Sequence, residues 1–248
     1  MPAKHSVFVL HRNGKPITPT TPCRARKLLK SGSAKPVWSR FGTFGIQLTS
    51  PSRGVAEYTA LGVDQGSKFE GYSIVAGSEN TINIKLDLPS KSNIVRKLAE
   101  RRYLRHSRRR RKCRRREARF QNRAMKNWLS PSQACIVNSR LKVMRELCRM
   151  FPITATGLED VRFNHCQYRW AKNFSTVEIG KSRIADFLES RGIELFKYLG
   201  FQTKSLREKF GYSKTSDKSA DKFSAHCSDS LSLAITVWYG SPVEPGLW

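Results

Sequence analysis

The stretch Ala60-Leu61-Gly62-Val63-Asp64 is an apolar run of β-strand length that ends in a carboxylate. Two further apolar runs, 71–76 and 81–86, follow after turn residues, so residues 58–88 are predicted to form three successive strands. Beyond them the chain is expected to alternate between a basic helix (94–119), a helix (132–150), a strand (151–158), a helix (179–191), a strand (193–198), a basic loop and a last helix (221–238). This order predicts a mixed α/β sheet.

A smaller, β-rich unit precedes these strands. Residues 7–10 are predicted to form a strand, and Asn13-Gly14 is a strong turn signal. The prolines at 16, 19 and 22 are expected to prevent regular structure up to a short basic helix, 23–30, that ends at Gly32. A second pair of strands is expected near 37–39 and 43–49, and a linker at 51–54.

The net charge bounds the function more than any other bulk property. The 248 residues include 46 Lys and Arg against 19 Asp and Glu, which gives a formal charge of +27. A field of this sign attracts polyanions, so a nucleic acid is the expected partner. There is no apolar run long enough for a membrane span and no signal peptide, and the six cysteines contain no C-x-x-C pair. We therefore expect a cytoplasmic protein with reduced thiols and no membrane partner.

The basic stretch needs a counterion. Residues 96–123 contain 15 Lys and Arg and only two acids, Glu100 and Glu117, for a local charge of +13. Like-charged pairs such as Arg101 and Arg105 destabilise an unliganded helix by about 0.2–0.5 kcal/mol each. A phosphate backbone would reverse that effect. The predicted nucleic-acid contacts are Arg101, Arg102, Arg105, Arg108, Arg109, Arg110, Arg111, Lys112, Arg114, Arg115, Arg116 and Arg119, joined by Arg24, Arg26 and Lys27 of the first helix.

Four residues form a candidate catalytic set. Asp64 and Glu159 each follow an apolar strand, and His226 and Asp229 are spaced i, i+3 on the predicted last helix. Any one of these residues alone is more often structural than catalytic. Together they provide the three carboxylates and the histidine of a phosphodiesterase site that holds two Mg²⁺ ions. Asp64, Glu159 and Asp229 are the predicted metal ligands, and His226 is predicted to assist deprotonation of water.

Several motifs in order resemble the transposon-encoded IscB and IsrB proteins. VFVLHRNGKPITP (7–19) and CRARKLLKSGSAK (23–35) resemble their PLMP domain, with Pro16-Ile17-Thr18-Pro19 at the signature position. LGVDQGSK (61–68) is similar to the first RuvC motif, and RRYLRHSRRRRKCRRREARFQNR (101–123) to the RRXRR bridge helix. WLSPS (128–132) with GLEDVRF (157–163) resembles the second RuvC motif, and GFQTKSLR (200–207) with HCSD (226–229) the third.

The resemblance implies an RNase H-like (RuvC) fold assembled from split motifs. It implies five segments: a PLMP-like domain (1–54), RuvC-I strands (55–90), an arginine-rich bridge helix (91–123), RuvC-II (124–165) and RuvC-III (166–248). It further implies an RNA-guided DNA endonuclease, monomeric within a ribonucleoprotein, with a structured guide RNA and target DNA as partners. Mg²⁺ is the expected cofactor, with Mn²⁺ able to substitute and no organic cofactor.

Two departures narrow this expectation. Only 67 positions separate Glu159 from His226, which leaves no HNH insertion, so the chain resembles the IsrB branch and is expected to nick one DNA strand, the non-target strand. Few residues follow the last helix, so no C-terminal module that reads a target-adjacent motif is expected. The alternatives are a structure-selective RuvC-like nuclease that needs no guide, and an inactive RNA-binding remnant of a mobile element.

Overall fold

Two β-sheets organise the computed structural model, which describes residues 6–50, 56–66, 68–77, 79–111, 129, 131–160, 180–217 and 221–240. The smaller sheet contains, in chain order, β1 (Val7–Leu10), β2 (Pro16–Thr20), β3 (Ala34–Trp38) and β4 (Phe44–Leu48). Its strand order is β2-β1-β4-β3, with β1 and β4 parallel. Helix α1 (Pro22–Lys30) packs Ala25, Leu28 and Leu29 against this sheet.

The prediction that prolines prevent regular structure before the first helix is wrong. Pro16 is the first residue of β2, which pairs with β1 across the predicted turn. β2 is an edge strand, where a residue without an N–H group costs no ladder bond on the open side. Pro22 begins α1, where its N–H would have no partner in the helix, and the Thr21 side chain accepts a hydrogen bond from the Arg24 N–H.

The larger sheet has the topology of an RNase H-like fold, as predicted. Its strands are β5 (Thr59–Asp64), β6 (Phe69–Ala76), β7 (Glu79–Asp87), β8 (Ala155–Glu159) and β9 (Glu194–Tyr198). They lie in the order β7-β6-β5-β8-β9, with the first three antiparallel and with β5, β8 and β9 parallel. The carboxyl ends of β5 and β8 therefore meet side by side at one edge of the sheet.

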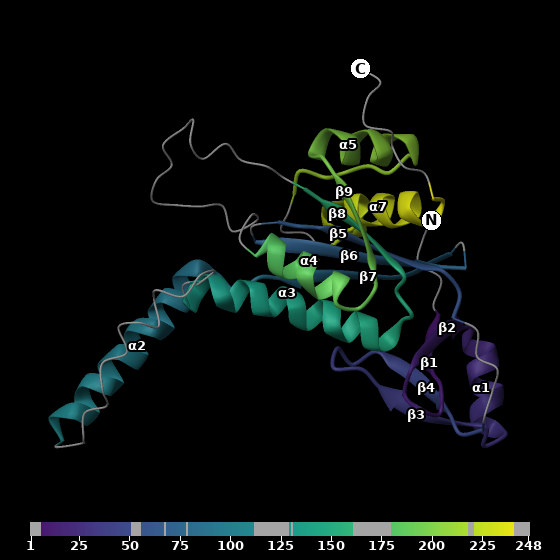
Figure 1. The fold of residues 1–248 in the computed structure, drawn as a ribbon, viewed down its shortest axis with the longest axis horizontal. Helices are drawn as coiled ribbons and strands as arrows, with labels where there is room; N and C mark the ends of the chain where they lie inside the picture. The colour runs from purple at the N-terminus through teal and green to yellow at the C-terminus, as the bar shows by residue number, and fades with distance from the viewer. Residues whose placement is uncertain are drawn as a thin grey trace.

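Helices cover both faces of the larger sheet (Figure 1). On one face, α3 (Pro131–Met150) and α4 (Lys181–Glu189) bury Met144, Leu147 and Ile184 against Leu61 and Leu158. On the other face lie α5 (Gly200–Lys209), α6 (Phe223–His226) and α7 (Ser228–Trp238). There Leu206 of α5 packs with Leu233 and Val237 of α7 over Ala60 and Ala155. The sheet is thus buried on both sides at its centre.

Two predictions for the C-terminal part are wrong. The segment expected to be a basic loop contains α5, because Thr203 and Leu206 are buried by tertiary packing that a short polar sequence does not announce. The expected single last helix is two helices, α6 and α7, which meet at Cys227. His226 therefore ends one helix, and Asp229 lies in the first turn of the next, so the two residues do not share one continuous helix face.

Helix α2 (Lys91–Arg110) leads away from the sheets (Figure 1). The Ser90 side chain caps it by accepting a hydrogen bond from the Asn93 N–H. Residues 112–119, predicted to continue this helix, lie outside the described residues. Within the described part of the chain, no helix combines the length and apolar character needed to cross a bilayer.

Candidate active site

Asp64 and Glu159 end two neighbouring parallel strands. Val63 of β5 is in register with Leu158 of β8, so the next residue of each strand carries a carboxyl at the same edge of the sheet. The two side chains share a hydrogen bond. Burial, this hydrogen bond and the negative charges of Asp64 and Asp229 together raise the pKa of Glu159 to about 9. Glu159 is therefore protonated at neutral pH and donates to Asp64.

Asp229 reaches the same site from α7. A close approach between α7 and the sheet brings it there, since a Cβ atom on Gly62 of β5 would lie 1.8 Å from the backbone oxygen of Ser230. Gly71 of β6 allows a similar approach by the backbone oxygen of His226. The Ser73 and Ser230 hydroxyls share a buried hydrogen bond of 2.8 Å across this interface. Small side chains on the sheet thus determine where the third carboxylate lies.

Two cations neutralise Asp229, which is only 3% exposed. Arg207 of α5 donates to Oδ1 at 2.5 Å, and Lys214, in the loop between α5 and α6, donates to Oδ2. Burial alone would lower the pKa of Lys214, but its hydrogen bond to Asp229 and the charges of Asp64, Asp229 and Glu159 outweigh burial and raise that pKa. Lys214 is therefore a permanent cation within the carboxylate cluster.

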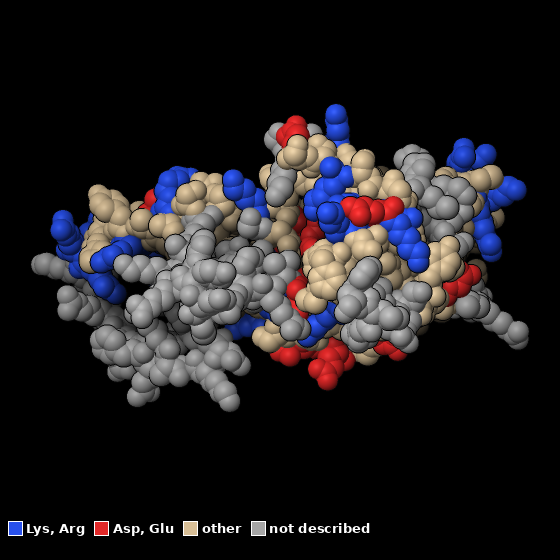
Figure 2. Space-filling model, turned by 90° about the horizontal axis from the view of Figure 1, so that it is seen from above, with Lys and Arg blue, Asp and Glu red and all other residues tan. Residues whose placement is uncertain are grey.

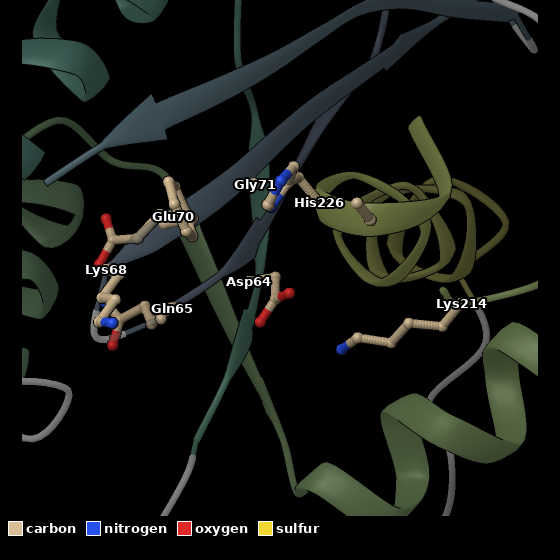
Figure 3. Close-up of a pocket in the computed structure, with 10 residues that line it drawn as sticks. Asp64, Gln65, Lys68, Glu70, Gly71, Lys214 and His226 are labelled. Atoms are coloured by element: carbon tan, nitrogen blue, oxygen red, sulfur yellow. The ribbon is translucent and has the colours of Figure 1, made fainter. Parts of the chain in front are cut away.

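A cavity of about 650 Å³ opens at this edge of the sheet. Asp64, Lys214 and His226 line it, and Figure 3 shows them arranged around one space, with the Lys214 ammonium pointing toward Asp64. The His226 ring is buried and packs on Phe69, with 5.0 Å between ring centroids. Its Nε2 atom has no hydrogen-bond partner among the described residues. An imidazole nitrogen with a free lone pair can accept a proton.

All four predicted catalytic residues therefore lie in this region: Asp64, Glu159 and Asp229 interact, and His226 lines the cavity beside Asp64. Sequence reasoning missed Arg207 and Lys214, because two more cations do not stand out in a chain of charge +27. It also missed Gln65, which is 3% exposed and whose amide oxygen and nitrogen make no hydrogen bond to any described residue. Gln65 follows Asp64 directly, and that adjacency was the available signal.

The donor chemistry of this cluster suits a hard divalent cation. Three carboxylates from three elements supply only oxygen ligands. The raised pKa of Glu159 reflects burial first, then its hydrogen bond to Asp64 and the negative charges of Asp64 and Asp229, which a divalent cation would offset. Among the described residues, no three His, Cys, Asp or Glu side chains already stand at metal-binding geometry. Arg207 and Lys214 occupy both oxygens of Asp229, so rearrangement of these contacts must accompany metal binding.

The predicted nucleic-acid contacts are exposed wherever they are described. Arg101, Arg105 and Arg108 of α2 face solvent, as do the other α2 arginines up to residue 111 and the basic residues of α1. Figure 2 shows Lys and Arg side chains along the end that α2 occupies and again at the opposite end, over α1. The remaining predicted contacts, Lys112, Arg114, Arg115, Arg116 and Arg119, lie outside the described residues.

A comparison with known protein families assigns this chain to one of them. The RRXRR protein family matches residues 7–179. This range includes the smaller sheet, helices α2 and α3, and strands β5 to β8 of the larger sheet, so that it contains both Asp64 and Glu159. The chain is a member of the RRXRR protein family. No curated protein matches this RRXRR protein.

Two solved structures resemble this RRXRR protein. RuvC of Thermus thermophilus in complex with a Holliday junction substrate is 14% identical, with a TM-score of 0.40, over 74% of this chain and 94% of that chain. A second structure of Thermus thermophilus RuvC is also 14% identical, with a TM-score of 0.40, over 73% of this chain and 95% of that chain.

Proposed function

We propose that this RRXRR protein is a metal-dependent endonuclease of the RuvC type that nicks one DNA strand under the direction of a bound guide RNA. The observation that carries the proposal is the meeting of Asp64, Glu159 and Asp229 in one interacting cluster at the edge of an RNase H-like sheet. The motifs that resemble those of the IscB and IsrB proteins, among them the arginine-rich stretch 101–123, support guidance by RNA.

Asp64, Glu159 and Asp229 would hold the metal ions through their carboxylate oxygens. Two bound Mg²⁺ ions would activate the attacking water and stabilise the leaving oxygen of the phosphodiester. The protein side chains have separate tasks. His226 accepts a proton at Nε2, which is buried and has no competing hydrogen bond within the part of the chain that the structure describes. Phe69 packs on the imidazole ring at the wall of the cavity that Asp64 also lines.

The arginines of α2 are proposed to bind the phosphates of the guide RNA or of its duplex with DNA. All described arginines from Arg101 to Arg111 are exposed, and the helix carries few acids to pair with them. Guanidinium groups form bidentate contacts with phosphates, which favours arginine over lysine for this role. Arg24, Arg26 and Lys27 on α1 form a second exposed basic surface, at the opposite end of the molecule from α2. The five segments expected from the sequence remain our proposed division of the chain.

The decisive experiment purifies the full chain expressed with its flanking genomic sequence, identifies the co-purified RNA and tests cleavage. A discrete structured RNA is expected, together with Mg²⁺-dependent nicking of supercoiled plasmid that carries a matching target. Asp64→Asn should abolish nicking and leave RNA binding within about twofold, because it removes one carboxylate of the cluster and none of the arginines of α2. Normal nicking by Asp64→Asn would contradict the assignment of the active site.

Two other results would point to the alternatives. Only heterogeneous RNA, combined with cleavage of branched DNA, would indicate a structure-selective nuclease that needs no guide. A discrete RNA without cleavage in Mg²⁺ or Mn²⁺ would indicate an RNA-binding remnant.

A further inference from the structure

The starting observation is that a lysine stands among the proposed metal ligands. The Lys214 ammonium donates a hydrogen bond to Oδ2 of Asp229, and the negative charge of Asp64 also acts on it. Among the carboxylates of the cluster, Asp64 makes the largest charge contribution to the raised pKa of Lys214. Lys214 and Asp64 line the same cavity (Figure 3). The ammonium therefore occupies the space that Asp64 and Asp229 would share around a divalent cation.

The two cations on Asp229 differ in how firmly they are held. Arg207 belongs to α5, next to the buried Leu206, and its side chain is 14% exposed. Lys214 belongs to a loop, its side chain is 37% exposed, and its four-carbon stem can turn to a new position. Arg207 can therefore keep its hydrogen bond to Asp229 Oδ1 while Lys214 leaves Oδ2.

The geometry points to Lys214 as a built-in counter-cation that holds the metal position and is displaced by the arriving divalent ion toward the phosphate of bound DNA. The inference rests on the proposed function, since it takes the cluster to be a metal site. Arg207 acts as a positioning residue that keeps Asp229 aimed at the cluster. Because a divalent ion and an ammonium repel one another at short range, the two cannot share this site, and their binding is mutually exclusive.

The affinity for a divalent metal, measured without nucleic acid, tests whether Lys214 competes with the metal for this site. Titration of the full chain with Mn²⁺ by calorimetry should show about tenfold tighter binding for Lys214→Gln than for the wild type, because the variant removes the competing charge. Lys214→Ala should behave in the same way, and Lys214→Arg should not. Lys204→Gln is the matched control: Lys204 is on α5, is 68% exposed and lies 3.9 Å from Glu208, so it removes an equal charge without touching Asp229.

Each outcome of this titration decides something. Equal or weaker Mn²⁺ binding by Lys214→Gln and Lys214→Ala would overturn the counter-cation role, as would an equal gain in Lys204→Gln. Binding by the variants when the wild type shows none would support it. A different result would contradict the metal site itself: Mn²⁺ binds to neither the wild type nor the variants, or it binds equally well after Asp64→Asn. The proposed function would then fail as well.

DNA affinity tests where Lys214 goes. A single-stranded oligonucleotide should bind wild type and Lys214→Gln equally in EDTA, because Asp229 holds the lysine there. In Ca²⁺ the variant should bind about threefold more weakly, because only the displaced lysine meets a phosphate. The same difference in both conditions, or none in either, would overturn this second half.

Discussion

Gly62 of β5 and the backbone oxygen of Ser230 in α7 are in contact so close that a methyl group at residue 62 would lie 1.8 Å from that oxygen. This contact sets the distance between α7 and the sheet. Since Asp229 precedes Ser230, the same contact determines how near the third carboxylate comes to Asp64, which is two residues beyond Gly62. Packing and the candidate site are therefore coupled at one backbone position.

Gly62→Ala should destabilise the protein by about 3 kcal/mol or more, because the clash is with backbone and cannot be relieved by a side-chain rotation. Urea denaturation measures the loss. Gly192→Ala is the control: it has a φ of +67° with open space around it, so it should cost only about 1 kcal/mol. An unchanged free energy of unfolding in Gly62→Ala would contradict the packing described for α7.

The buried pair Glu70 and Arg140 provides a second stability test. Arg140 is fully buried and its Nε donates to Glu70 at 2.6 Å, while Tyr72 also donates to the same carboxylate at 2.9 Å. Arg140→Met should cost about 3–5 kcal/mol, because it leaves the Glu70 carboxylate buried beside a single neutral donor. Glu70→Gln combined with Arg140→Met should recover much of that loss. A double variant as unstable as the single one would contradict the charge explanation.

The raised pKa of Glu159 predicts how stability depends on pH. Burial and the neighbouring Asp64 and Asp229 raise its pKa from 4.5 to about 9, so the folded state binds this proton more tightly than the unfolded state does. The stability contribution is complete below pH 4.5 and is lost as the pH rises toward 9. In EDTA, the melting temperature of the wild type should fall over this range more steeply than that of Glu159→Gln. Melting temperatures that fall equally steeply with pH in the two proteins would contradict the raised pKa of Glu159.

The same shift predicts proton release when metal binds. A carboxyl that is protonated before binding must lose its proton to become a ligand. Apparent Mn²⁺ affinity should therefore rise with pH up to about 9, the pKa of Glu159. Calorimetry in two buffers of different ionisation enthalpy would detect the released proton. Identical heats in both buffers would mean that Glu159 binds no metal or is already ionised.

The arginines of α2 predict a salt-dependent affinity for RNA. Replacing Arg105 and Arg108 together with Ala should weaken RNA binding and lower the slope of log K against log salt by about 0.7–0.9 for each phosphate that is no longer neutralised. Fluorescence anisotropy at several salt concentrations measures both. Lys204→Ala with Lys209→Ala, which removes two charges from α5, is the control. Equal effects from the two pairs would indicate that only net charge matters.

Local pattern was sufficient for much of the fold. Apolar runs located all five strands of the larger sheet within a few residues, because strand length and side-chain alternation are properties of neighbouring residues. It failed at α5, where only Thr203 and Leu206 are buried within the helix and the remaining pattern is polar. It also missed the break at Cys227, where α6 ends and α7 begins; both helices contact β6, a strand far away in the sequence.

The sequence by itself determined the chemistry available to this protein: carboxylates at the ends of two strands, Asp64 and Glu159, an acid and a histidine near the last helix, and a dense arginine run. Only the tertiary structure decided how these groups act on one another. The protonation of Glu159 and the pairing of Asp229 with Arg207 and Lys214 arise where β5, β8, α5 and α7 meet. Charge interactions depend on the distance between the groups and on their burial. For residues far apart along the chain, both quantities are set by the fold and cannot be obtained from the local sequence.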